Sequence, residues 1–152
     1  MIGKSLLCKN LKCAHAGIVQ CNDPLSFRTF ASMNINNTSL EKILSGLKIN
    51  ALNEMQTAAF ETITTNDNVV LLSATGSGKT IAFLLPLLHL FNPSQKKTQA
   101  LIITPSRELA QQIELVFKKM TTGFKVTCCY GGHKREIEEN NLVESPALII
   151  GT

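Results

Sequence analysis

The sequence predicts an α/β fold, in which a parallel β-sheet carries helices on both faces. The first observation is a set of four short runs rich in β-branched and aliphatic residues, at 69–72, 100–104, 125–129 and 147–150. The second is that segments of helical character separate these runs, at 79–91, 106–120 and 133–143. Strands that alternate with helices of this length form right-handed βαβ units, whose crossover helices cover both faces of a parallel sheet.

Composition is that of an ordinary globular domain. The chain of 152 residues is long enough for one domain with a core, and 44% hydrophobic with 17% charged residues argues against disorder. The net charge of +4 is uneven, because residues 1–32 hold four basic residues and one acidic residue. The rest of the chain is nearly neutral, so a nucleic-acid partner has to be argued from a site and not from bulk charge.

Neither a membrane span nor a metal cluster is predicted. The longest apolar run, Ile81 to Phe91, is interrupted by Pro86 and His89, and it is shorter than the roughly 20 residues that a spanning helix needs. The five cysteines have spacings that match no common zinc pattern, and their number is odd. We therefore expect reduced thiols in an intracellular, cytoplasmic protein.

Residues 1–32 differ from the rest and are predicted to be a leader or a disordered segment. They are basic, rich in Cys and Asn, and show no sustained hydrophobic period. One interpretation is a transit peptide with a processing site in "RTFAS" (28–32), which would make the protein mitochondrial. The other is a disordered or misassigned leader before a true start at Met33. The second is favoured because the segment lacks Arg-rich amphipathic character.

Two helices are predicted between Met33 and the first strand. Apolar residues recur at helical spacing from Leu40 to Leu47. The next helix is expected to begin at Asn53–Glu54, because Asn can cap a first turn and Glu suits it, and to fray within 64–68. Further along, Ser106 stands where it can cap the helix over 106–120.

The stretch "ATGSGKT" (74–80) joins a predicted strand to a predicted helix and has the chemistry of a phosphate-binding loop. Gly76 and Gly78 allow a tight turn and a close approach of the backbone to an anion, and amides at the helix N-terminus then point at the phosphates. Lys79 supplies a charge to the β- and γ-phosphates, and Thr80 offers a hydroxyl to Mg²⁺. The general pattern has Gly where this chain has Ser73.

Gln56 lies upstream of the loop, in "LNEMQ" (52–56). Its amide offers a donor and an acceptor side by side, which matches N7 and N6 of adenine. A single glutamine on a helix is also common as a solvated residue.

Together these residues resemble the start of a DEAD-box ATP-dependent RNA helicase. The segment "SATGSGKT" (73–80) is similar to that family's motif I, and "TPSRELA" (104–110) to motif Ia with Ser106 in place of the usual Thr. Tyr130-Gly131-Gly132 resembles the paired-glycine motif, and "LIIGT" (148–152) the strand that leads into motif Ib. The helix with Gln56, preceded by "FASMNI" (30–35), resembles the Q-motif region. These motifs follow one another in order over about residues 30–152.

The resemblance implies a P-loop NTPase fold with a RecA-like parallel sheet, incomplete at its C-terminal end. The implied organisation is a Q-motif region over 33–58 and a helicase ATP-binding domain over 59–152, cut before the DEAD motif. The implied cofactors are ATP and Mg²⁺, with Lys79 and Thr80 as catalytic residues and Thr80 as the Mg²⁺ ligand. The residues implied to hold the nucleotide are Gln56, Ser73, Ala74, Thr75, Gly76, Ser77, Gly78, Lys79 and Thr80. Those implied to lie along RNA, by backbone contacts independent of sequence, are Pro105, Ser106, Arg107, Gly131, Gly132 and Thr152.

Some features depart from the family pattern. The Q motif usually has an aromatic residue that stacks on adenine, but alignment puts Ile49 there, and Phe30 is the other aromatic upstream. Pro86 falls inside a predicted helix, where the family tolerates proline, so a kink is expected. No Asp-Glu-Ala-Asp occurs. The family's separate Ser-Ala-Thr motif and its second domain with an arginine finger are also missing, because the Ser-Ala-Thr at 73–75 belongs to motif I. The parent protein is therefore expected to be an RNA helicase, while this chain is expected to bind nucleotide weakly without hydrolysing it.

Several alternatives stay open from the sequence. The chain could be a non-catalytic nucleotide- or RNA-binding fragment, or belong to another P-loop class such as a DNA helicase or a transport ATPase. Arg107 and Glu108 could form a surface ion pair and nothing more. His133-Lys134-Arg135 is interpreted as a solvated helix start. The sequence does not identify the target RNA or accessory proteins.

Overall fold

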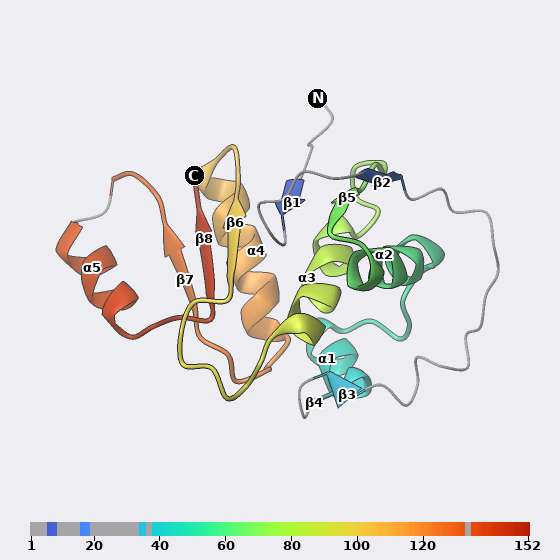
Figure 1. Ribbon diagram of the computed structural model, residues 1–152, viewed down its shortest axis with the longest axis horizontal. Coiled ribbons are helices and arrows are strands. Elements are labelled where there is room, and N and C mark those ends of the chain that lie inside the picture. Colours follow the sequence, from blue (N-terminus) through green and yellow to red (C-terminus); the bar gives the residue numbers. More distant parts are fainter. Residues whose placement is uncertain (1–5, 9–15, 19–33, 36–37, 133–134) are drawn as a thin grey trace.

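A computed structural model of the chain (Figure 1) describes residues 6–8, 16–18, 34–35, 38–132 and 135–152. Its central feature is a parallel three-stranded sheet formed by β6 (Ala100–Ile103), β7 (Val126–Cys129) and β8 (Leu148–Gly151). The strand order is β6-β8-β7, and Leu148 is in register with Ala100 on one side and Val126 on the other. Because the strands are parallel, their carboxyl ends all lie at one edge of the sheet.

The helices begin and end close to where the sequence predicts them. They are α1 (Leu40–Leu47), α2 (Glu54–Thr65), α3 (Lys79–Leu90), α4 (Arg107–Lys119) and α5 (Arg135–Val143). Both predicted caps are confirmed: the Asn53 side chain accepts from the Gln56 amide, and the Ser106 side chain from the Leu109 amide. These side chains satisfy donors that the first turn of a helix leaves without a partner.

The strand before the glycine-rich loop, β5 (Asn68–Val70), belongs to a different sheet from the one that the sequence analysis expects. It pairs antiparallel with β1 (Leu6–Cys8) and parallel with β2 (Ala16–Ile18). Both partners lie within 1–32, where the sequence analysis predicts no strand. The backbone groups at the edges of a strand need hydrogen-bond partners. For β5, β1 supplies them at one edge and β2 at the other. A hairpin of β3 (Asn34–Ile35) and β4 (Thr38–Ser39) precedes α1.

Several predictions about the N-terminal segment fall outside the described residues. These are the processing site at 28–32, the aromatic Phe30 and the start at Met33. His133 and Lys134, interpreted as part of a solvated helix start, also lie outside them.

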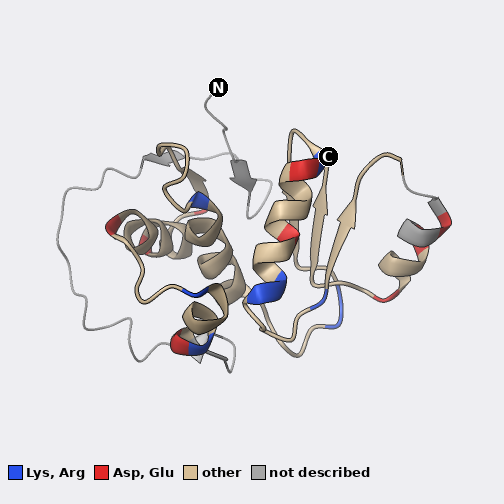
Figure 2. Ribbon diagram, turned by 180° about the vertical axis from the view of Figure 1, so that it is seen from behind, with Lys and Arg blue, Asp and Glu red and all other residues tan. Residues whose placement is uncertain are grey.

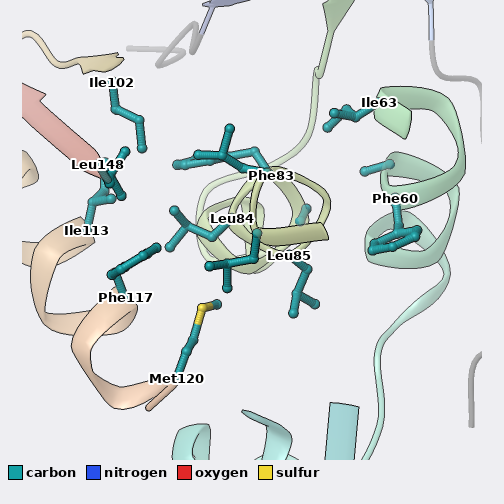
Figure 3. Packing of buried hydrophobic residues seen from close by; sticks show 14 of the residues in the cluster. Phe60, Ile63, Phe83, Leu84, Leu85, Ile102, Ile113, Phe117, Met120 and Leu148 are labelled. Atoms are coloured by element: carbon teal, nitrogen blue, oxygen red, sulfur yellow. The ribbon is translucent and has the colours of Figure 1, made fainter. Parts of the chain in front are cut away.

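The hydrophobic core is built around α3, which buries seven consecutive residues from Ala82 to Leu88. A helix that is apolar on all sides needs neighbours on all sides. In Figure 3, Phe60 and Ile63 of α2 lie on one side of α3, and Ile113 and Phe117 of α4 lie on the other, next to the parallel sheet. Pro86 is buried inside this helix and does not end it. The core therefore fixes α3, and with it the loop at the N-terminus of α3.

The parallel sheet packs one face against this core, and part of the other face is exposed at β6. Side chains alternate along a strand, so Ile102 is buried at 7% exposure while Leu101 and Ile103 are exposed at 57% and 71%. The α/β class is confirmed. At β6, however, the helices of the described residues cover one face of the sheet, where the sequence predicts cover on both.

The described residues contain no helix long and apolar enough to cross a membrane. The same residues hold no group of three or more His, Cys, Asp or Glu side chains placed to bind a metal. Cys128 and Cys129 are free thiols. Burial, with the nearby Glu114 carboxylate, raises the pKa of Cys128 to about 12, so this thiol stays protonated at neutral pH.

Candidate functional site

The glycine-rich loop connects β5 to α3 in the conformation that the sequence predicts for an anion site. Gly76 and Gly78 have φ angles of 81° and 87°, which residues with a Cβ rarely adopt. Gly78 is the N-cap of α3, and no side chain caps this end of the helix. A Cβ on Gly76 would meet no atom within 4 Å, so the loop is open on that side. The positive end of the helix dipole faces that loop.

Lys79 turns back over the loop that precedes it. Its Nζ donates to the Ser73 carbonyl oxygen at 2.9 Å and to the Ala74 carbonyl oxygen at 2.6 Å. The hydroxyls of Ser73 and Ser77 are also hydrogen-bonded to each other. The ammonium group is therefore held at the loop by two neutral acceptors. A phosphate, which carries full negative charge, is a stronger acceptor for the same group.

Gln56 lies against the loop and is buried, at 5% exposure. Its Oε1 accepts from the Asn53 amide at 3.0 Å, which completes a capping box at the start of α2. Its Nε2 donates to the Gly78 carbonyl oxygen at 3.3 Å. A Cβ on Gly78 would lie only 2.4 Å from that Nε2. Glycine is thus required at 78 for two reasons: the backbone conformation and the approach of Gln56.

The Gln56 amide has hydrogen-bonding groups that its contacts within the protein do not use. A glutamine amide has two N–H donors and two lone pairs on its oxygen. The contacts to Asn53 and Gly78 use one of each. One donor and one lone pair remain, the two kinds of group that adenine N7 and N6 require.

Asn53, predicted from the sequence only as a helix cap, also contacts the glycine-rich loop. Its Nδ2 donates to the Ser77 carbonyl oxygen at 3.1 Å, while its Oδ1 accepts from the Gln56 amide at 2.9 Å. One side chain therefore ties the start of α2 to the glycine-rich loop. Nothing in the sequence indicates this contact, because the two residues are 24 positions apart and belong to different motifs.

The other residues predicted to hold the nucleotide lie on the same loop. Thr75 is exposed, and Thr80 is half-buried in the first turn of α3, next to Lys79. A single hydroxyl suits Mg²⁺, which usually keeps several waters and takes most of its other ligands from phosphate oxygens. The residues present fit a nucleotide with its Mg²⁺, with Thr80 as the protein ligand.

The residues predicted to lie along RNA come together at the carboxyl edge of the parallel sheet. Pro105, Ser106 and Arg107 follow β6, the glycine pair 131–132 follows β7, and Thr152 follows β8. The strand ends are held together by backbone bonds. The Thr104 amide donates to the Gly151 oxygen at 2.8 Å, and the Thr152 amide donates to the Cys129 oxygen at 3.3 Å.

Thr104 positions the start of motif Ia and was not singled out from the sequence. Its side chain is buried, at 6% exposure. Its hydroxyl is within hydrogen-bond distance of the Ser106 oxygen, at 3.0 Å, and of the Gly151 oxygen, at 3.3 Å. The turn that leads into α4 is thereby fixed to the end of β8.

Arg107 is exposed at the first turn of α4. The ion pair anticipated with Glu108 is present, with 3.8 Å between Arg107 Nε and Glu108 Oε1. A backbone hydrogen bond, the Ser106 side chain and Arg107 together lower the pKa of Glu108 from its usual value. Exposed pairs of this kind hold their partners weakly. Figure 2 shows lysines and arginines dispersed over the described chain, without a basic stripe.

These features define a P-loop nucleotide-binding domain: a glycine-rich loop with Lys and Thr between a strand and the N-terminus of a buried helix. The sequence model of the DEAD/DEAH box helicase family matches residues 53–152. The chain belongs to this family.

Relatives and solved structures agree with that assignment. The chain is 40% identical over 105 residues to the DEAD-box ATP-dependent RNA helicase CshC of Bacillus cereus, a match that covers 66% of this chain and 26% of that protein. The yeast DEAD-box splicing factor Prp28 superposes with a TM-score of 0.67 at 26% identity, covering 83% of this chain and 32% of that one. Prp28 from Chaetomium thermophilum, bound to ADP, superposes with a TM-score of 0.58 at 31% identity, covering 74% of this chain and 30% of that one. The chain thus spans about a quarter to a third of these proteins.

Proposed function

We propose that this chain is the nucleotide-binding and part of the RNA-binding region of an ATP-dependent RNA helicase. One observation carries the proposal: Gln56, the candidate adenine reader, contacts Gly78 of the phosphate loop. A base-reading group and a phosphate-binding loop are therefore held together in one site. The relatives support it, since CshC is an ATP-dependent RNA helicase and one Prp28 structure holds ADP.

The nucleotide site divides into a base side and a phosphate side. Gln56 reads adenine with its remaining donor and lone pair. The backbone of 74–80 and the N-terminus of α3 hold the phosphates, and Lys79 exchanges its bonds to the Ser73 and Ala74 oxygens for phosphate oxygens. Mg²⁺ bound at Thr80 would neutralise charge on the β- and γ-phosphates. Ile49 offers an apolar surface without a π face, and base stacking is correspondingly weak.

RNA lies along the carboxyl edge of the parallel sheet, in contact with the sites after β6, β7 and β8. Arg107 and the start of α4 bind phosphate, and Gly131 and Gly132 allow the RNA backbone to come close. Contacts of this kind read no base edges, so binding is independent of RNA sequence.

Hydrolysis is assigned to the parent protein and not to this chain alone. The 152 residues contain no Asp-Glu-Ala-Asp, the acidic motif that the helicases of this family use to bind Mg²⁺. The chain alone therefore acts as a nucleotide- and RNA-binding unit. We place it in the cytoplasm, on the ground that Cys128 and Cys129 are free thiols; a mitochondrial location is the alternative if 1–32 is a transit peptide.

Replacement of Lys79 by Ala tests the nucleotide site. We expect the variant to lose measurable affinity for a fluorescent ADP analogue in the presence of Mg²⁺, because the loop then has no cation for the phosphates. Lys97→Ala, a change at an exposed lysine away from the loop, is the matched control and should bind like the wild type. Unchanged ADP affinity in Lys79→Ala would refute the assignment of the site.

A further inference from the structure

Tyr130 adjoins one of the segments predicted to bind RNA and contacts Arg107 of the other. It directly precedes the glycine pair that follows β7. The guanidinium carbon of Arg107, in the first turn of α4, lies over its ring at 5.7 Å from the centroid. The Gln111 Nε2 atom donates to its hydroxyl at 2.7 Å. No role for this tyrosine follows from the motifs, since the paired-glycine motif is defined by Gly131 and Gly132.

The two side chains that contact Tyr130 come from one face of α4. Arg107 and Gln111 are four residues apart, so they are neighbours on the helix surface. One of them lies over the face of the ring and the other binds the hydroxyl at its edge. The ring is therefore restrained in two directions, and α4 is linked to the end of β7 by side chains in addition to the backbone of the sheet.

The same arrangement brings the guanidinium group of Arg107 beside the glycine pair. Gly132 has a φ angle of 100°, and a Cβ built on it would lie 3.9 Å from Arg107 Nη1. Arg107 thus contacts the ring of Tyr130 and also lies next to the backbone two residues further on. A cation held over an aromatic face keeps its N–H groups free to bind an anion in the plane of the guanidinium.

Glu108 is a second contact of Arg107. Glu108 is adjacent on α4, with 3.8 Å between its Oε1 and Arg107 Nε, and both side chains are more than half exposed. Arg107 makes this contact and the contact with the Tyr130 ring in one conformation. An exposed ion pair is weak, so the contact with the ring adds to what holds the guanidinium in place.

We propose that Tyr130 is a positioning residue for RNA: it holds Arg107 beside Gly131 and Gly132, so that the guanidinium and the glycine backbone bind one stretch of sugar–phosphate backbone. This inference rests on the proposed RNA-binding function and adds to it a residue that contacts no RNA itself. It predicts that removal of the ring weakens the phosphate contact of Arg107 although no charge is removed.

The test is the salt dependence of binding to a fluorescein-labelled oligouridylate, followed by fluorescence anisotropy in a series of KCl concentrations. Each phosphate contact to a single strand contributes about 0.7 to the slope of log affinity against log salt. Arg107→Ala is expected to reduce the slope by about that amount. Tyr130→Leu should give the same reduction. Tyr130→Phe, which keeps the ring, should keep the wild-type slope and lose only the affinity that depends on the hydrogen bond from Gln111.

The double variant separates positioning from general destabilisation. If Tyr130 acts through Arg107, Arg107→Ala with Tyr130→Leu binds RNA no more weakly than Arg107→Ala alone. Additive losses in the double variant, or a wild-type slope in Tyr130→Leu, would overturn the inference and leave the proposed function intact. If the wild-type chain binds ADP but no oligouridylate at any salt concentration, the RNA-binding part of the proposed function fails, and this inference fails with it.

ADP affinity is the folding control, because the nucleotide site lies on another loop. Tyr130→Leu should bind the ADP analogue like the wild type. If it does not, Gln111→Ala decides the question, since it removes an exposed amide and leaves the ring in place. Loss of this one hydrogen bond should lower RNA affinity by about fivefold, with no further loss when Tyr130→Phe is added. Wild-type RNA affinity in Gln111→Ala would then overturn the inference.

Discussion

Gln56 shows how one side chain can belong to a helix and to a binding site at once. Its oxygen completes the capping box of α2, and its amino group binds the Gly78 oxygen. Both contacts use only half of the hydrogen-bonding capacity of the amide. In the proposed function, the stability of α2 and the recognition of a base therefore depend on the same group, and a substitution can separate them.

Gln56→Glu is expected to separate the two roles. Glutamate still completes a capping box, but it faces the Gly78 oxygen with an acceptor in place of a donor, so the midpoint of thermal unfolding should fall modestly. It has no N–H for the Gly78 oxygen or for adenine N7. The preference for the ADP analogue over its GDP counterpart should therefore fall by about tenfold, as expected for the loss of a bidentate contact.

The ratio of the two affinities is the quantity to measure, because repulsion between the new carboxylate and the phosphates affects both nucleotides alike. A wild-type ratio in Gln56→Glu would show that Gln56 does not read the base. Gln95→Glu, at an exposed position in the loop after α3, is a control for the added charge.

At the residue scale, the sequence predicts those features that depend on residues close together along the chain. The caps at Asn53 and Ser106 were predicted, because a cap is recognised from the residues that follow it. The glycine, lysine and threonine of the loop were recognised in the same way. The contacts of Asn53 with Ser77 and of Gln56 with Gly78 join residues 24 and 22 positions apart, and no local pattern reports such a contact.

At the scale of elements, the packing of α1 against the end of α4 depends on a glycine inside a helix. A Cβ on Gly46 would lie 2.3 Å from the Lys119 carbonyl oxygen, which is backbone and cannot turn away. Glycine within a helix ordinarily costs about 1 kcal/mol relative to alanine. Here the close approach of the two helices reverses that preference.

Gly46→Ala is therefore expected to destabilise the chain, in contrast to the usual effect of this substitution in a helix. Overpacking typically costs 1–3 kcal/mol, and the gain in helix propensity offsets about 1 kcal/mol of this cost, so the free energy of unfolding should fall by up to about 2 kcal/mol. Urea unfolding followed by circular dichroism measures the free energy of unfolding of the variant and of the wild type. Ser45→Ala, at the exposed position before it, is the control and should leave the stability nearly unchanged. A more stable Gly46→Ala variant would mean that α1 and α4 do not pack this closely.

The elements themselves were predicted well, whereas their pairing was not. β6, β7 and β8 and the five helices lie within about two residues of the predicted ranges, because hydrophobic period and caps are local signals. The pairing of β5 with β1 and β2 was missed. Three-residue strands in a basic segment without a period carry little signal, and the choice of partner strand depends on contacts distant in sequence.

At the scale of the whole molecule, the two candidate sites lie at the ends of different sheets. The phosphate loop follows β5, and the residues predicted to contact RNA follow β6, β7 and β8. The buried helix α3 begins at the phosphate loop and packs between α2 and the second half of α4 (Figure 3). The nucleotide site therefore rests on the most buried element of the fold, while the second site lies at an exposed edge.

Hydrogen exchange of the backbone amides, with and without Mg²⁺ and ADP, tests the central claim most directly. The account predicts that ADP slows exchange in two segments, the loop and first turn of α3 (74–82) and the start of α2 (53–57), because Gln56 joins them. Gly131 and Gly132 should exchange at the same rate in both conditions. Unchanged exchange over 74–82 at saturating ADP, or protection confined to other segments, would contradict the assignment of a nucleotide site to this chain.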